Sequence, residues 1–262
     1  MAQQTQVSRV AVFYSAWLKK FPNWQSLAKV SSGIVLRQWS GLGYNNRALR
    51  LHALARTVVK EYDGTLPSSV EKLHELPGVG RYTAHAVACF AFGAHVSLVD
   101  INIRRTLTRM FRLVRSSSEL KSEKEAWALA DTLLPRRGAS AWNQALMDLG
   151  AQVCTARKPR CPDCPVKHEC ASAFSSAFEK KESRERKKEP SFKGIPRRIY
   201  RGKILKALHD RPLTSRQIGL RIVHEFHPHD LRWIDGILKK MEIDSLITIR
   251  GSGARKKVGI AR

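Results

Sequence analysis

The chain has 262 residues and carries 47 Lys and Arg against 22 Asp and Glu, a formal net charge of +25. No apolar stretch approaches the roughly 18 residues needed to cross a bilayer, so we expect no membrane-spanning segment. So basic a protein usually binds a polyanion. Nucleic acid is the leading candidate, with a ribosomal or membrane-surface role as the alternative.

The positive charge is densest towards the C-terminus, which suggests how the chain is divided. Residues 180–262 hold 23 Lys and Arg against 9 Asp and Glu, whereas residues 1–179 hold 24 against 13. The segment 179–190 is rich in charge and lacks apolar residues, which is typical of a solvated linker. We therefore predict three regions: a body over 1–175, a charged linker over 176–193 and a basic domain over 194–262.

The body is expected to be helical. Apolar residues recur at helical spacing over residues 10–21, 48–62, 124–134 and 141–154, and a Pro or an Asp-Gly pair follows several of these runs. Strand-like alternation is scarce. The sequence therefore predicts an all-α body of several short helices joined by short turns.

A glycine-containing turn over residues 76–84, LPGVGRYTA, is predicted to join two helices. The first should end near Leu73 and the second begin at about Arg81. Gly78 and Gly80 allow positive φ angles and let another backbone approach closely. The amides at the start of the second helix would then point outward, where a phosphate can bind. Taken alone, the turn is equally typical of a plain connection between helices.

Asp100 follows about 20 residues later, in the segment VDINIRR over residues 99–105. It occupies the expected N-cap of an amphipathic helix that ends near Val114. On this pattern alone, Asp100 is predicted to be a helix cap and nothing more.

Four cysteines, Cys154, Cys161, Cys164 and Cys170, fall within 17 residues. Thiolates at this density hold an iron–sulfur cluster or a zinc ion. The six residues between the first two are too many for a usual zinc knuckle, which favours a [4Fe–4S] cluster over zinc. Disulfides are a further alternative, although no secretory signal precedes them. The fifth cysteine, Cys89, lies in an apolar run and is predicted to be buried.

Together, the glycine turn, the aspartate at this interval and the downstream cysteines resemble the helix-hairpin-helix DNA glycosylase superfamily, in its iron–sulfur branch. That branch includes endonuclease III and the MutY-type adenine glycosylases, and the resemblance covers about residues 1–172. Segments 1–7, 39–44 and 149–151 are most similar to the MutY type. The resemblance implies a mainly α fold, a [4Fe–4S] cluster and double-stranded DNA with a mispaired or damaged base as the partner.

The resemblance also implies roles for individual residues at the active site. Asp100 matches the catalytic aspartate, and Asn102 matches a second polar group beside it. Tyr82 takes the position where bifunctional endonuclease III relatives place a catalytic lysine. We therefore expect a monofunctional glycosylase without an efficient lyase step.

Further positions match DNA contacts of the family. Gln4 matches a side chain that wedges into the duplex beside the flipped base, and Thr5 and Tyr44 match contacts around the opposite purine. The hairpin of Gly78 and Gly80 would hold phosphates without reading sequence. We expect a cytoplasmic monomer, associated with the nucleoid if the source is bacterial or archaeal.

The start of the chain departs from the MutY pattern. In that family, the glutamate that protonates the departing adenine lies just upstream of the motif matched by residues 1–4, and this chain starts after that point. We expect a truncation, with the reading frame continuing upstream into an apolar helix that contains a Glu. The alternative is a protein that lacks this acid.

The C-terminal region also departs, because residues 194–262 do not resemble the Nudix-like domain that MutY proteins usually carry. Helices are predicted over 201–210, 215–223 and 231–241, followed by a hairpin with strands at 246–249 and 257–260. This order resembles a winged-helix domain. Its hairpin offers four cations for phosphate contact, Arg250, Arg255, Lys256 and Lys257. A domain that only packs against the body or a protein partner is the alternative.

The sequence thus predicts an enzyme that removes adenine paired with 8-oxoguanine or guanine. A thymine or uracil mismatch glycosylase of the same fold is the first alternative, because neither Tyr82 nor Asp100 discriminates between the two. A non-catalytic protein that binds damaged DNA is the second alternative, because no residue of the chain can be assigned as the missing acid.

Overall fold

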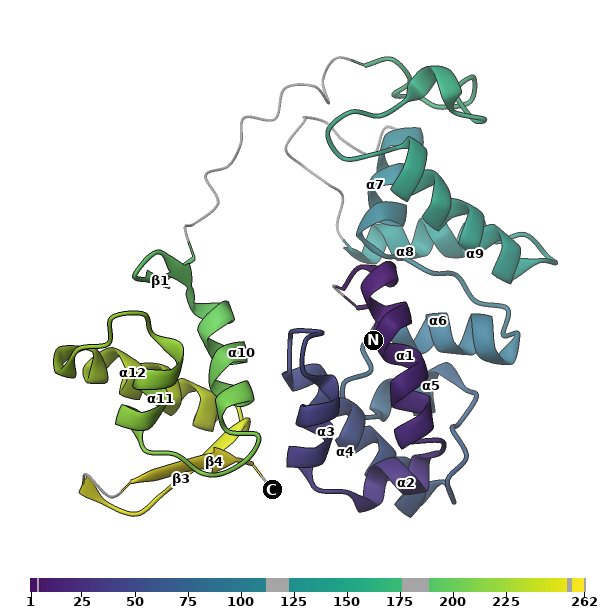
Figure 1. The fold of residues 1–262 in the computed structure, drawn as a ribbon. Coiled ribbons are helices and arrows are strands. Elements are labelled where there is room, and N and C mark those ends of the chain that lie inside the picture. The colour runs from purple at the N-terminus through teal and green to yellow at the C-terminus, as the bar shows by residue number, and fades with distance from the viewer. Residues whose placement is uncertain (4, 112–122, 176–188, 254–255, 262) are drawn as a thin grey trace. The chain divides into compact units, whose positions relative to one another are not determined.

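The computed structural model describes residues 1–3, 5–111, 123–175, 189–253 and 256–261. Over these residues the structure is mainly helical, as predicted, and its strands form two short hairpins (Figure 1). Contacts group the chain into two compact units, Met1–Leu66 with Lys187–Arg262, and Pro67–Arg186. None of the helices in these residues has the length and hydropathy needed to span a bilayer.

The first unit begins with four helices: α1 (Val7–Lys20), α2 (Trp24–Lys29), α3 (Ser32–Trp39) and α4 (Asn46–Glu61). Trp17 of α1 and Trp39 of α3 are almost fully buried and meet edge to face, with ring centroids 5.4 Å apart. Asn23 starts α2 through a reciprocal capping box with Ser26. Because Trp39 is the last residue of α3, its burial fixes the start of the loop that joins α3 to α4.

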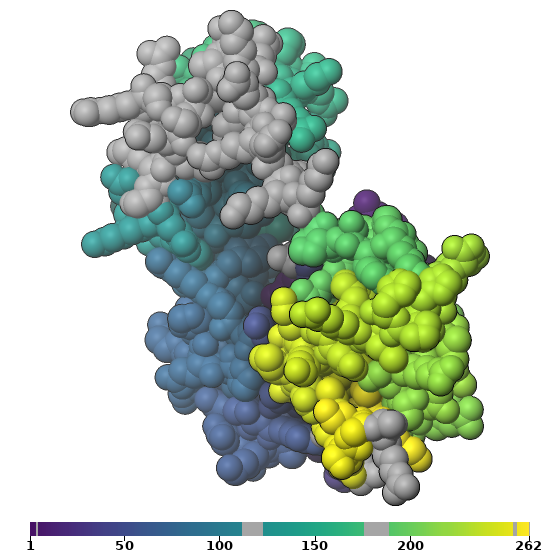
Figure 2. Space-filling view, turned by 90° about the vertical axis from the view of Figure 1, so that its left-hand side faces the viewer, coloured from purple at the N-terminus to yellow at the C-terminus, as the bar shows by residue number. Residues whose placement is uncertain are grey.

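The C-terminal elements of the first unit include the three helices and the hairpin in the predicted order, preceded by a short strand pair that was not predicted. They are β1 (Ser191–Phe192), β2 (Ile195–Pro196), α10 (Arg197–Ala207), α11 (Ser215–Ile222), α12 (Leu231–Ile243), β3 (Ile247–Arg250) and β4 (Lys257–Ile260). β3 and β4 pair antiparallel, with Ile247 opposite Ile260. Tyr200, Ile204 and Ile234 are fully buried, and Figure 2 shows these elements, from green to yellow, as one continuous body. The winged-helix resemblance itself stays a prediction.

The second unit contains five α-helices: α5 (Val70–Glu75), α6 (Arg81–Phe92), α7 (Ile101–Met110), α8 (Glu123–Thr132) and α9 (Ala139–Asp148). α9 continues into the π-helical turn η1 (Leu149–Val153). A short 3-10 helix, η2 (Cys161–Asp163), follows later in the chain. The core of this unit joins α7, α8 and α9 through buried apolar residues, among them Ile103, Trp127 and Leu146. The predicted burial of Cys89 is confirmed, with 1% of the residue exposed.

Some predicted boundaries shift in the structure. The helix expected to run from Ala141 to Cys154 changes to a π-helical turn at Leu149, and Cys154 follows that turn as its C-cap. α7 ends at Met110, whereas the helix was expected to end near Val114. Residues 112–122, and residues 176–188 of the predicted linker, lie outside the described residues. The predicted domain boundaries stay a prediction.

Candidate active site and cysteine cavity

The α5–α6 connection has the form of a tight glycine turn. Gly78 adopts a φ of 79°, in the left-handed region, and the Val79 amide donates to the Leu76 carbonyl at 3.1 Å. Gly80 is different: its φ is −89°, so it does not use the left-handed region that glycine allows. It serves as the N-cap of α6, makes no side-chain capping bond and has open space where a Cβ would lie. An anion could therefore approach the first turn of α6.

Asp100 is the N-cap of α7, as the sequence predicts. Its Oδ1 accepts hydrogen bonds from the backbone amides of Asn102 at 2.9 Å and Ile103 at 2.7 Å. Its Oδ2 accepts a further bond from Asn102 Nδ2 at 3.2 Å. The carboxyl group thus lies at the N-terminal end of the α7 dipole. The cap therefore holds a half-buried carboxylate in one orientation. A catalytic carboxylate also requires a fixed orientation.

Tyr82, on the first turn of α6, lies close enough to Asp100 to interact with its charge. Burial raises the pKa of the Tyr82 phenol, and the negative charge of Asp100 raises it further. The hydroxyl donates to Met147 Sδ at 3.9 Å. The phenol therefore stays neutral near pH 7. Unlike a lysine, a tyrosine also has no amine for covalent attack on a sugar.

Arg105 connects the Asp100 region to the first cysteine. Its guanidinium donates to Asn102 Oδ1 at 3.0 Å, to the Gly150 carbonyl at 2.6 Å and, through Nε, to the Cys154 carbonyl at 2.9 Å. Burial lowers the pKa of Arg105. No role for Arg105 was predicted from the sequence. The available signal was its spacing, because a residue three positions after Asn102 lies on the same helix face.

Gly150 allows the π-helical turn to lie directly against α7. A Cβ at this position would come within 2.9 Å of Asn102 Cβ and 3.1 Å of both the Asn102 carbonyl oxygen and Thr106 Oγ1. Real side chains do not tolerate the first of these distances without displacement. The glycine is therefore required for the contact through which Arg105 reaches Cys154.

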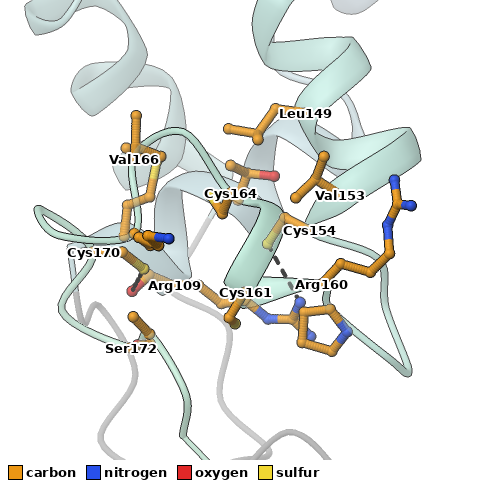
Figure 3. A pocket seen from close by; sticks show the side chains of 15 residues that line it. Arg109, Leu149, Val153, Cys154, Arg160, Cys161, Cys164, Val166, Cys170 and Ser172 are labelled. Atoms are coloured by element: carbon orange, nitrogen blue, oxygen red, sulfur yellow. Dashed lines mark hydrogen bonds between the residues drawn. The ribbon is translucent and has the colours of Figure 1, made fainter.

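All four predicted metal ligands, Cys154, Cys161, Cys164 and Cys170, line one cavity of the second unit, and Figure 3 shows them around it. None of them forms a disulfide, so the disulfide alternative is not observed. Burial is the main cause of a raised pKa at Cys170, and the charges of the other three thiols raise it further. The sequence thus predicts correctly which side chains come together.

Arg109 supports this cavity from α7 and was also missed by sequence reasoning. It is 7% exposed, and its guanidinium donates to Cys154 Sγ at 3.4 Å, to the Thr155 carbonyl at 2.7 Å and to the Ala156 carbonyl at 3.0 Å. The Cys170 thiol lies 3.9 Å from the Arg109 carbonyl (Figure 3). Arg109 therefore holds the first cysteine and the two residues after it against α7.

The donors at this cavity are of a kind that metals bind. Four cysteine sulfurs line the space, and the Arg109 guanidinium lies against the first of them. Over the described residues, no three His, Cys, Asp or Glu side chains are placed to hold a single metal ion together. Four thiols at one cavity are donors of the kind that hold an iron–sulfur cluster or a zinc ion.

In the first unit, Arg47 contacts two of the predicted DNA-contact residues, Thr5 and Tyr44. Tyr44 is 61% exposed, with a φ of 47°, and Thr5 is half-buried. Arg47 donates to Thr5 Oγ1 at 2.7 Å and to the Gly43 carbonyl at 3.2 Å, and its guanidinium lies 5.4 Å from the Tyr44 ring centre. It also bonds the Met1 and Gln3 carbonyls. Gln4 lies outside the described residues.

Residues 1–131 match the family model for HhH-GPD superfamily base excision DNA repair proteins. The chain belongs to this superfamily. It is 39% identical over 258 residues to the adenine DNA glycosylase of Mycolicibacterium smegmatis, covering 97% of this chain and 83% of that relative. That match therefore extends into the C-terminal elements. The family part of the prediction is confirmed.

Other relatives match about two thirds of the chain. The human adenine DNA glycosylase is 43% identical over 171 residues, which cover 65% of this chain and 31% of the human protein. Among solved structures, that of a thermostable thymine-DNA glycosylase aligns with a TM-score of 0.61 at 32% identity, covering 65% of this chain and 79% of that one. The chain thus spans most of one relative and about a third of another.

Proposed function

We propose that this protein is a monofunctional base excision repair glycosylase that flips adenine out of a mispair with 8-oxoguanine or guanine and hydrolyses its N-glycosidic bond. The observation that carries the proposal is the Asp100 carboxylate, fixed at the N-terminus of α7 by two amides and by Asn102, with Tyr82 beside it. Relatives at 39% and 43% identity that are named adenine DNA glycosylases support the choice of base.

Asp100 stabilises the positive charge that develops on the sugar as the glycosidic bond breaks. A carboxylate near C1′ does this electrostatically, and it works best when its orientation is fixed before the reaction. The hydrogen bonds from Asn102 and Ile103 supply that fixed orientation. Tyr82 is neutral and forms no Schiff base with the sugar, so hydrolysis ends with base release and an intact strand.

The DNA is held through its phosphates and through the space left by the flipped base. The first turn of α6, opened by Gly78 and Gly80, binds a phosphate without reading sequence. Thr5 and the exposed ring of Tyr44 contact the opposite purine. Flipping is needed because the glycosidic bond of a stacked base is not accessible to a protein side chain.

A [4Fe–4S] cluster on Cys154, Cys161, Cys164 and Cys170 fits the cavity described above. Bound there, it has a structural role, tying together a loop with little secondary structure. That loop carries Lys158, Arg160 and Lys167, which suit contact with the DNA backbone. Arg105 links the loop to Asn102, so folding of the loop and orientation of Asp100 are connected.

Thymine or uracil opposite guanine is the second candidate substrate. The alignment with a thymine-DNA glycosylase at 32% identity favours it. The chemistry assigned to Asp100 is the same for a pyrimidine, so the base pocket decides between the candidates.

Single-turnover excision assays test the proposal. They use duplexes with A opposite 8-oxoguanine, A opposite G, T opposite G and U opposite G, and protein expressed from its gene with any in-frame upstream residues included. Adenine release that Asp100→Asn abolishes supports the proposal. Release of thymine or uracil alone would assign the mismatch activity instead, and no release from any duplex would reject a glycosylase.

A further inference from the structure

A large cleft in the first unit is lined by positive charge. Its volume is about 830 Å³, and its walls are the loop between α3 and α4, the start of α4 and one face of α10. Seven of its lining residues are cationic and none is acidic: Arg9, Arg47, Arg50, Arg198, Arg201, Lys203 and Lys206. An anionic ligand is the chemistry that such a lining favours.

Most of this charge is not neutralised by the protein. Arg198 pairs with Glu189, and Arg201 pairs with Asp244 at 2.6 Å. Arg47 donates to neutral acceptors, and Lys203 Nζ lies 5.5 Å from the centre of the neutral Tyr200 ring.

The remaining cations have no counterion within the described ranges. No carboxylate of those residues lies within ion-pair distance of Arg9, Arg50 or Lys206. Five cations therefore face the cleft uncompensated, which raises the free energy of the protein until an anion binds.

Gly202 leaves the α10 wall open at its centre. It is an exposed residue in the interior of the helix, lines the cleft and would bring a Cβ into empty space. Because a Cβ there would meet no neighbour, packing does not require the glycine. Helix stability does not favour it either, since glycine is among the poorest helix formers. Its smallness allows another molecule to approach the helix backbone between the turns that carry Arg198 and Lys206.

The opposite wall carries the exposed Tyr44 ring. An aromatic face next to a row of cations suits a ligand that has both stacked bases and phosphates. We infer that α10 is a DNA-binding element and that this cleft holds the sugar-phosphate backbone of one strand of the duplex on which the glycosylase acts. The inference rests on the proposed function for the choice of DNA, and it gives the C-terminal region a role in substrate binding.

Salt-dependent binding tests the role of the lysines. Fluorescence anisotropy of the full chain with a duplex containing A opposite 8-oxoguanine is recorded over a range of KCl concentrations. Removing one cation that neutralises a phosphate should lower the slope of log Kd against log salt by about 1, so Lys203→Gln/Lys206→Gln should lower it by about 2 and weaken binding about tenfold. Arg216→Gln/Lys239→Gln, which removes two exposed cations outside the cleft, is the matched control.

A pair of glycine variants tests the open wall without changing charge. Gly202→Gln and Gly236→Gln both replace an exposed glycine inside a helix where a Cβ meets nothing. Both should raise the melting temperature, because glutamine is the better helix former. Only Gly202→Gln should weaken DNA binding.

The outcomes separate this inference from the proposed function. Unchanged slopes in the lysine variant, or equal DNA affinity of the two glycine variants, would reject α10 as a DNA-binding element even if adenine is excised normally. If the lysine variant has a reduced slope but the unmodified protein excises no base, the DNA-binding cleft is retained and the glycosylase activity is rejected. A reduced slope together with normal excision at saturating protein would support both.

Discussion

Two regions of the molecule handle charge in opposite ways. Around α7 and the π-helical turn, each charged group has partners: Asp100 accepts three hydrogen bonds, and Arg105 and Arg109 donate to carbonyls and to a cysteine sulfur. Along the cleft between α10 and the Tyr44 loop, five cations have no counterion among the described residues. The first arrangement fixes geometry, as catalysis requires, and the second leaves charge for a ligand to neutralise.

This contrast predicts different consequences of mutation. Changes in the partnered region should alter reaction rate or folding stability with little effect on the salt dependence of binding. Changes along the cleft should alter the salt dependence and leave the rate at saturation intact.

The largest expected effect is at Asp100. Asp100→Asn removes the negative charge but keeps an N-cap residue of nearly equal quality, so the single-turnover rate should fall about 10³-fold while stability changes little. Asp100→Ala should lose the rate equally and also cost about 1 kcal/mol of unfolding free energy through the lost cap. Excision assays and thermal melts measure the two effects. An active Asp100→Asn protein would contradict the assignment of Asp100.

Arg105→Met tests whether the partnered region depends on its internal connections. The substitution leaves Asn102 Oδ1 and the carbonyls of Gly150 and Cys154 without this donor. We expect a loss of about 2–4 kcal/mol of unfolding free energy, measured by urea denaturation, because half-buried acceptors lose their partner.

The control for Arg105→Met is Arg137→Met, which removes an exposed cation of the same unit and should change stability little. Equal stability of the two variants would show that the Arg105 connections contribute nothing to folding.

Gly150→Ala should have the next largest effect. The added Cβ would lie 2.9 Å from Asn102 Cβ and 3.1 Å from the Asn102 carbonyl, so either the π-helical turn or α7 must shift. Overpacking of this kind typically costs about 1–3 kcal/mol. Denaturation should show that loss, and the excision rate should fall with it because Asn102 orients Asp100. A protein with wild-type stability and rate would show that the two segments can separate freely.

The sequence was sufficient to predict features that depend on local patterns. Asp100 as an N-cap, the start of α6 at Arg81 and the order of the three C-terminal helices and their hairpin follow from propensity and capping, which act within a few residues. The shared cavity of the four cysteines followed from their close spacing. These signals do not require knowledge of what packs against them.

The features that were missed depend on contacts between distant segments. Arg105 and Gly150 are 45 residues apart, and Arg47 reaches back 46 residues to the Met1 carbonyl. An arginine inside a helix has the same local pattern whether it faces water or a buried carbonyl, so its role is set by tertiary structure. The α10 cleft was missed for the same reason, since its walls come from opposite ends of the sequence.

The smallest predicted effect concerns His52, which is 2% exposed on α4, the helix that follows the Tyr44 loop. Burial lowers its pKa, and the positive charge of Arg56 lowers it further. The folded state therefore binds this proton less readily than the unfolded state, whose His pKa is about 6.5. The stability that neutral His52 contributes is present above that value and is lost as the pH falls below it.

Between pH 7.5 and pH 5.5, this difference should lower the unfolding free energy by at most about 1.4 kcal/mol. His52→Gln should reduce the pH dependence. Urea denaturation at the two pH values measures the effect. If His52→Gln keeps the full pH dependence, the loss of stability in acid arises at other groups. The first unit would then tolerate a protonated, buried His52 on α4.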